Sequence, residues 1–282
     1  MDIACIISAV LFWISGGFRA AQMMQWRRQP NFNYIMWTDF DAEYLIQQWD
    51  FRIDHRSFEM ATGMINAIAW FTFAIPMLHV VWLQSLKGRR IISIHVAIAL
   101  MAIGGAVTEL LARLFYIGST STMEWMVKDF QLENWTESAE GDHLGWKSLE
   151  VTHLAIMGVL TWIDALEYLF LSFIFAFLFV SVWRKSERLL DVKWARFGMV
   201  LSALSLIDFA ADLMRYQNWR KYSRITFVIS ALNRLVLFPV WLLWLAIQIP
   251  KAEAILGEAS QPTEETKKFS SNLNDDSSHV VS

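Results

Sequence analysis

Apolar residues gather in six long runs, which shorter polar segments separate. The runs cover residues 3–24, 58–84, 91–117, 150–183, 197–216 and 225–249. A helix needs about 20 apolar residues to cross a bilayer, because each residue rises 1.5 Å. Every run meets this length. The pattern therefore predicts an all-α membrane helix bundle with about six transmembrane helices, in a single domain over residues 1–250.

Each predicted span carries one polar edge. Residues three or four apart share a face of a helix, and polar residues recur at that spacing in every run. An ionised side chain that faces lipid at the centre of a span costs about 2.5–3.5 kcal/mol. The edges are therefore expected to turn inward, in a bundle that is apolar outside and polar inside. Their members are Ser8, Ser15, Arg19; Glu59, Thr62, Asn66; Glu109, Arg113, Tyr116; Glu150, His153, Asp164, Glu167; Ser205, Asp208, Asp212, Arg215; and Ser230, Asn233, Arg234.

The depth of these polar residues follows from the alternating direction of the spans. Measured from the long connections at 26–57 and 118–149, Asp164 and Glu167 lie deepest, near the midplane. Both belong to the segment TWIDALEYLF, residues 161–170. The sequence therefore predicts a vestibule that opens toward the long connections and ends near Asp164 and Glu167. The other candidate site residues lie in the half nearer those connections: Asn66, Glu109, Arg113, Asp208, Asp212 and Arg234.

Acids outnumber bases inside the predicted spans. Three arginines, at 113, 215 and 234, face five carboxylates: Glu109, Asp164, Glu167, Asp208 and Asp212. If each arginine pairs with one acid, two acids keep no counter-charge and become candidates for cation coordination or proton exchange. The structural alternative is a set of salt bridges that joins the helices. For Asp164 and Glu167, the choice depends on whether Arg113 or Arg234 reaches them from another span.

The short connections predict the orientation of the chain. LKGRR (86–90) and WRKSERLLDVKWAR (183–196) are rich in Lys and Arg, which marks the cytoplasmic side. Both termini are then cytoplasmic, in the plasma membrane or an endomembrane. Asn134 begins an Asn-Trp-Thr glycosylation sequon in a long connection, which agrees with this orientation. The basic residues of the connection 217–224 argue against it.

The composition supports a membrane protein and excludes other classes. The chain of 282 residues is 55% hydrophobic and 18% charged, whereas soluble domains have about 45–50% apolar and about 25% charged residues. A net charge of −3 gives no basic excess for nucleic acid. The single cysteine, Cys5, excludes an intrachain disulfide framework. The expected partners are the lipid bilayer and a second copy or a membrane complex.

Metal and cofactor signals are weak. Glu150 and His153 form a Glu-x-x-His pair, a motif that di-iron bundles use twice. Their position at a membrane boundary favours an interfacial capping pair instead. His79 and His95 stand singly on apolar spans, as core histidines do. The nucleotide-binding and hydrolase motifs are absent from the sequence, so the cofactor stays unassigned.

Two segments outside the spans also carry predictions. Thr38–Phe51 has a helix-start signal and an apolar stripe, which predicts a short helix at the interface or a small lid on the helix ends. Residues 251–282 are polar and are expected to form a disordered tail.

Three functions remain open on the sequence. The favoured one is a transporter, channel-like protein or sensor for a small cation, a proton or a polar solute. The second is a membrane enzyme acting on a lipid or isoprenoid, with Glu59 or Glu150 as a carboxylate at headgroup depth. The third is a structural subunit of a membrane complex.

Overall fold

The computed structural model describes residues 1–26, 42–86, 93–129, 144–183, 189–214 and 219–259. Nearly all of these residues are helical, and the described part of the chain contains no strand. The predicted all-α bundle is confirmed, because six of its helical segments are long and apolar enough to cross a membrane. The helical elements are α1 (Ile3–Trp26), α2 (Ala42–Leu86), α3 (Ser93–Asp129), α4 (Leu144–Trp183), α5 (Val192–Met214), α6 (Trp219–Leu232), the π-helical turn η2 (Asn233–Leu237) and α7 (Phe238–Ala259).

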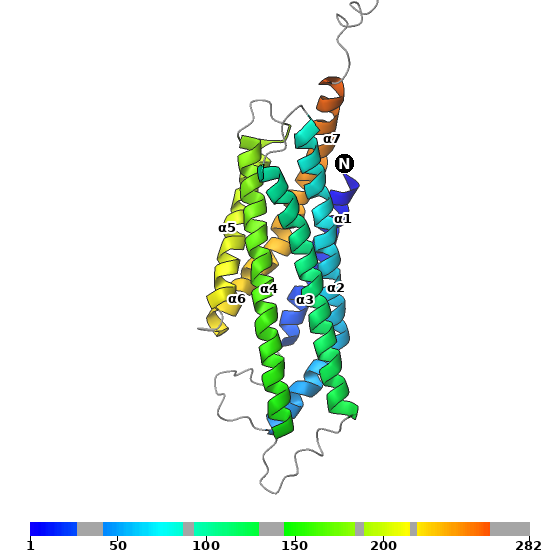
Figure 1. Cartoon of the computed structure of the whole chain (residues 1–282), viewed down its shortest axis with the longest axis vertical. Coiled ribbons are helices and arrows are strands. Elements are labelled where there is room, and N and C mark those ends of the chain that lie inside the picture. Colours follow the sequence, from blue (N-terminus) through cyan, green and yellow to red (C-terminus); the bar gives the residue numbers. More distant parts are fainter. Residues whose placement is uncertain (27–41, 87–92, 130–143, 184–188, 215–218, 260–282) are drawn as a thin grey trace, which may run out of the picture.

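The helices form a closed ring. From α1 to α6, each helix packs against the next helix along the chain. The ring closes because α7 packs against α1 (Figure 1). The backbone N–H of Asp2 donates to the carbonyl of Ala246 at 2.9 Å, which joins the start of α1 to α7. On α2, His79 Nδ1 lies 3.4 Å from Asp2 Oδ2, and His79 Nε2 lies 3.1 Å from Glu253 Oε1 of α7. The start of α1 and the end of α7 therefore lie at one end of the bundle.

The sixth span is built from three elements in series. By length and mean hydropathy, this span runs from Arg224 to Gly257. It covers most of α6, all of η2 and most of α7. In η2 the N–H of Phe238 donates to the carbonyl of Asn233, five residues back. The next residue, Pro239, has no N–H to donate. The π turn therefore lies directly before the proline, where the regular hydrogen-bond pattern of the α-helix is already interrupted.

Several predicted boundaries need correction. The third helix continues to Asp129 and the fourth begins at Leu144, so both extend into the predicted connection 118–149. The last helix does not end at residue 249, because α7 continues through Pro250 to Ala259. Residues 260–282 of the predicted tail lie outside the described residues. The predicted lid at 38–51 is also different, since residues 42–51 form the first turns of α2 rather than a separate helix. Trp49 anchors these turns by packing with Met123 of α3 and Leu149 of α4.

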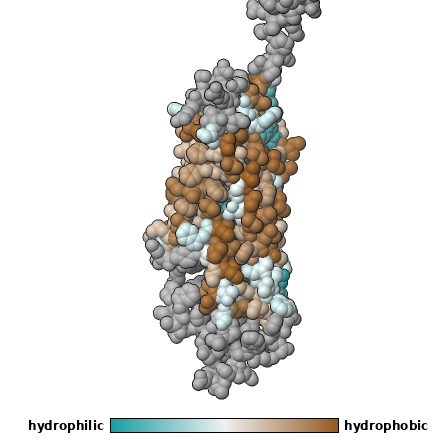
Figure 2. All heavy atoms as spheres, in the orientation of Figure 1, coloured by the Kyte–Doolittle hydropathy of each residue, from teal (hydrophilic) through white to brown (hydrophobic). Residues whose placement is uncertain are grey.

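The surface of the bundle is apolar along its length. Large exposed side chains occur on every spanning helix, for example Trp13, Ile75 and Leu100. Figure 2 shows this as a broad hydrophobic band between the two ends of the molecule. Most of the polar edges are buried, as predicted. The distribution follows from lipid as the solvent, because exposed polar groups would have no water to bind there.

An aromatic core fills the half of the bundle nearest the start of α1. Phe12, Phe73 and Phe238 contact one another with ring centroids 5.3–6.4 Å apart. Trp194 of α5 stacks on Trp241 of α7 at 4.5 Å. These contacts hold α1, α2, α5 and α7 together. His95 is buried in this half beside Ser181, 2.8 Å away, as a core histidine.

Candidate functional site

Arg113 of α3 lies at the centre of a buried charge network. Its Nε donates to Glu109 Oε1 at 2.6 Å and its Nη2 donates to Glu109 Oε2 at 3.2 Å. The same Nη2 donates to Asp164 Oδ1 of α4 at 2.9 Å. The predicted pair of Glu109 and Arg113 is therefore present. The partner of Asp164 comes from another span, as the sequence required.

Glu167 completes a group of three acids. Glu109, Asp164 and Glu167 each place a carboxylate oxygen within 4.8 Å of the others. Glu167 is 2% exposed, and its Oε1 has no hydrogen-bond partner among the described residues. Carboxylate oxygens at this spacing can hold a small cation. Because Arg113 already donates to two of the three acids, a cation or proton would share the group with it.

Asn66 fixes the position of Glu109 from α2. Its Nδ2 donates a short hydrogen bond to Glu109 Oε1, and its Oδ1 accepts one from Ser15 of α1 at 2.8 Å. Asn66 is 3% exposed and Ser15 is fully buried. The chain of contacts from Ser15 to Glu109 joins three helices. Asn66 therefore belongs to the network, as the sequence predicted.

Two further arginines surround the three acids. Arg234, on η2, lies within electrostatic range of Glu109, Glu167 and Tyr168. Arg19, on α1, lies within electrostatic range of Arg234, Tyr168, Arg113 and Asp164. The sequence assigned Arg234 as a counter-charge but did not do so for Arg19. The signal for Arg19 was its place on the polar edge of the first span.

The acids of α5 form the other half of the network. Asp208 is fully buried and Asp212 is 2% exposed, and both interact electrostatically with Tyr168 of α4. Thr226 of α6 donates its hydroxyl to Asp212 at 3.2 Å. The Tyr168 hydroxyl donates to Ser230 of α6 at 3.0 Å. Tyr168 was not among the candidates predicted from the sequence, because an aromatic residue on an apolar helix gives no charge signal.

Two glycines let the arginines approach the neighbouring backbones. A Cβ added at Gly63 of α2 would lie 2.9 Å from Cδ of Arg113. A Cβ added at Gly16 of α1 would lie 3.1 Å from Cβ of Arg234 and 3.0 Å from Cγ of Leu235. Contacts this short exclude a larger side chain unless the neighbour moves. Both glycines therefore shape the space that the arginines occupy.

Ion pairs cross between helices near the end that carries the long connections. Arg52 of α2 donates to both oxygens of Glu150 on α4, at 2.6 and 3.1 Å. Arg56 pairs with Glu124 of α3. The Tyr116 hydroxyl donates to Glu59. These contacts lie where the sequence predicted an opening, and they tie α2 to α3 and α4 there.

These contacts also affect the metal and enzyme alternatives. Glu150 is held by Arg52, and the ring of His153 packs edge-on against Trp49 at 5.4 Å. Among the described residues, the group with metal-ligand spacing is Glu109, Asp164 and Glu167, and it includes neither Glu150 nor His153. The carboxylates that a lipid enzyme would need at headgroup depth, Glu59 and Glu150, are both engaged by neighbours.

Two of the residues singled out from the sequence lie outside the described residues. They are the sequon residue Asn134 and Arg215, the third predicted in-span arginine. Eight of the other candidates form one buried polar layer through contacts and electrostatic interactions: Asn66, Glu109, Arg113, Asp164, Glu167, Asp208, Asp212 and Arg234. Glu150 and His153 lie apart from this layer, beside Arg52 and Trp49.

The fold and the buried network define a multi-pass helical membrane protein with ionisable side chains in its interior. Comparison with known proteins adds no narrower class: no protein family, no curated protein and no solved structure matches the chain.

Proposed function

We propose that this protein moves or senses a small cation, with the proton as the best candidate, through the acids Glu109, Asp164 and Glu167. One observation carries the proposal. One carboxylate oxygen from each of these three acids lies within 4.8 Å of the other two inside the bundle. Glu167 Oε1 has no hydrogen-bond partner among the described residues. Charged groups inside a membrane are rare and mark ion or proton pathways.

The charge balance of the interior supports a positive ligand. In the described interior, the arginines at 19, 113 and 234 face five carboxylates: Glu109, Asp164, Glu167, Asp208 and Asp212. Three guanidinium groups leave an excess of two negative charges when all groups are ionised. Carboxylates this close repel each other, and sharing one proton relieves the repulsion. A bound proton or cation neutralises the same excess.

Arg113 is the group through which binding would be coupled to a change in the helices. It joins Glu109 of α3 to Asp164 of α4. A proton or cation on Asp164 weakens its attraction to Arg113, so the contact between α3 and α4 loosens when the ligand binds there. Arg113 keeps its contact with Glu109, which is on its own helix.

The proposal is tested in sealed vesicles that contain the purified protein. A pH-sensitive dye follows the collapse of an imposed pH gradient, and matched Na⁺ and K⁺ gradients identify the ion. We expect Glu167→Gln to reduce the flux at least about 10-fold, because it removes the acid with the unbonded oxygen. Glu253→Gln is the matched control, since Glu253 is 47% exposed at the other end of the bundle.

Two outcomes contradict the proposal. One is a Glu167→Gln protein that conducts as the wild type does. The other is a wild-type protein that moves none of these ions and whose thermal unfolding midpoint is insensitive to them. Ligand binding to the folded state raises that midpoint, so sensing without transport is detected by the second measurement.

A structural role for the network is the second candidate. The observation in its favour is the contact of Arg113 on α3 with Asp164 on α4, together with the Arg52–Glu150 pair between α2 and α4. Such contacts hold helices together in a membrane. Under this alternative, Glu167→Gln changes the free energy of unfolding but there is no ion flux for it to change.

A further inference from the structure

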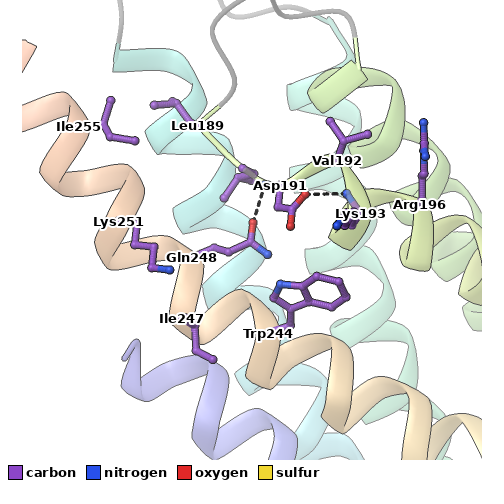
Figure 3. A pocket seen from close by; sticks show the side chains of 11 residues that line it. Leu189, Asp191, Val192, Lys193, Arg196, Trp244, Ile247, Gln248, Lys251 and Ile255 are labelled. Atoms are coloured by element: carbon purple, nitrogen blue, oxygen red, sulfur yellow. Dashed lines mark hydrogen bonds between the residues drawn. The ribbon is translucent and has the colours of Figure 1, made fainter.

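A hollow of about 610 Å³ lies between the start of α5 and the second half of α7. Figure 3 shows it from close by. It is at the end of the bundle where α1 begins and α7 ends, away from the buried charge network (Figure 1). Its volume is within the range of about 300–1,000 Å³ that is typical of small-molecule sites. Its lining includes Leu190, Asp191, Lys193, Trp244, Gln248 and Lys251.

The lining of the hollow is positively charged. Lys193, Arg196 and Lys251 outnumber the one carboxylate among the described lining residues, Asp191. Asp191 Oδ1 already accepts the backbone N–H of Lys193 at 2.8 Å, and so caps α5. The guanidinium carbon of Arg196 lies 5.5 Å from the ring centre of Trp183, which positions the group over the ring. The hollow therefore suits an anionic ligand.

Gln248 supplies an independent sign of a ligand. Its Oε1 accepts the backbone N–H of Asp191 at 2.7 Å (Figure 3). This bond assigns the oxygen, so the other end of the amide is the NH₂ donor. The side chain is 7% exposed, and Nε2 has no hydrogen-bond partner among the described residues. A buried donor without a partner is unfavourable, and an acceptor on a ligand in the hollow would satisfy it.

The position and the walls of the hollow indicate a lipid rather than a soluble anion. Ile247, Ile255 and Leu190 give it apolar walls beside the basic groups. The span of α5 begins at Val192, and the last span reaches Gly257. The hollow therefore lies at the depth where a span meets the headgroup layer. Trp244 lines the hollow and Trp183 contacts Arg196 of its lining, and tryptophan is enriched at membrane interfaces.

We propose that this hollow binds the headgroup of an anionic phospholipid. Lys193, Lys251 and the Gln248 amide would donate to the phosphate, and Ile247 and Ile255 would contact the acyl chains. Basic pockets between transmembrane helices bind anionic headgroups in this way. The site is separate from the acids of the proposed cation site, so neither proposal depends on the other.

The test is native mass spectrometry of the full chain, released from detergent after titration with phosphatidylglycerol or phosphatidylcholine. We expect one phosphatidylglycerol to be retained in preference to phosphatidylcholine. K193Q/K251Q should weaken its retention on the order of 10-fold, because each basic group near the surface contributes about 1 kcal/mol. The control K128Q/R224Q removes two exposed cations outside the hollow.

A second variant, Gln248→Glu, keeps an oxygen acceptor for Asp191 and replaces the NH₂ donor with a carboxylate oxygen. It should also weaken the retention of phosphatidylglycerol, and the thermal unfolding midpoint of each variant verifies that it is folded. Three results would overturn the proposal: equal retention of the two lipids, unchanged retention in both K193Q/K251Q and Gln248→Glu, or equally strong competition by inorganic phosphate.

Discussion

Arg113 has a different role from that of the arginines near the ends of the bundle. It is 18% exposed and donates to Glu109, which is fully buried, and to Asp164. Removing one partner of a buried ion pair leaves the other charge without compensation, and this costs about 3–5 kcal/mol. Removing both partners is much less harmful. The stability of the network therefore depends on its charge balance more than on the presence of any one group.

We expect Arg113→Gln to lower the free energy of unfolding by about 3 kcal/mol, because Glu109 and Asp164 lose their donor. In the double variant E109Q/R113Q, part of this loss should be recovered. Chemical unfolding of the purified protein in mixed micelles measures both values. Arg224→Gln, at an exposed position, serves as the control and should change little.

If the losses from E109Q and R113Q simply add in the double variant, the two side chains are not coupled, and this interpretation of the network is contradicted.

At the scale of the elements, α2 and α3 approach each other closely where a glycine faces a tryptophan. A Cβ added at Gly105 of α3 would lie 2.8 Å from Cζ3 of Trp70. Trp70 is 2% exposed and packs edge-on against Phe12 and Phe73, so its ring has little room to move. The neighbouring Gly104 is less constrained, because its added Cβ would meet Phe170 at an ordinary 3.6 Å. The two adjacent glycines therefore have unequal roles.

Gly105→Ala is expected to destabilise the protein by about 1–3 kcal/mol, the usual effect of overpacking a core. Gly104→Ala should be neutral or slightly stabilising, since alanine favours a helix over glycine by about 1 kcal/mol. Thermal unfolding followed by tryptophan fluorescence compares them on the same helix. Equal midpoints for the two variants would show that the contact between Gly105 and Trp70 does not limit the packing of α3.

At the scale of the whole molecule, the closed ring sets which connections share a side. Because α1 begins where α7 ends, the end of α2, the start of α3 and the end of α4 lie on one side of the bundle. The end of α1, the start of α2, the end of α3 and the start of α4 lie on the other. In the sequence, the Lys/Arg-rich connections follow helix ends of the first side. The distribution of basic residues therefore predicts that this side is cytoplasmic.

Cysteine labelling tests this orientation, because the chain has a single cysteine, the buried Cys5, to replace. In a Cys5→Ala background, an impermeant thiol reagent applied to intact cells should label Ser138→Cys but not Ser186→Cys. After permeabilisation, both should react. Labelling of Ser186→Cys in intact cells, without labelling of Ser138→Cys, would invert the predicted orientation.

The sequence alone determined the fold class of this protein and the faces of its helices that are buried. Six apolar runs and their polar edges were enough to predict the spans, the apolar surface and the buried polar layer, because lipid and helical geometry act on each segment separately. The same rule selected Asn66, Glu109 and Arg113 as members of one network. It also required a partner for Asp164 from another helix.

Only the tertiary structure decided which partners meet, because contacts between helices depend on their rotation and neighbours in the ring. Arg113 rather than Arg234 hydrogen-bonds Asp164. Tyr168 joins the network although its local pattern gave no such signal. Arg19, which the sequence placed only on a polar edge, lies within electrostatic range of Asp164. The basic hollow between α5 and α7 has the same origin. Asp191 and Gln248 are 57 positions apart in the sequence. Only the folded chain brings the backbone nitrogen of Asp191 within 2.7 Å of Gln248 Oε1.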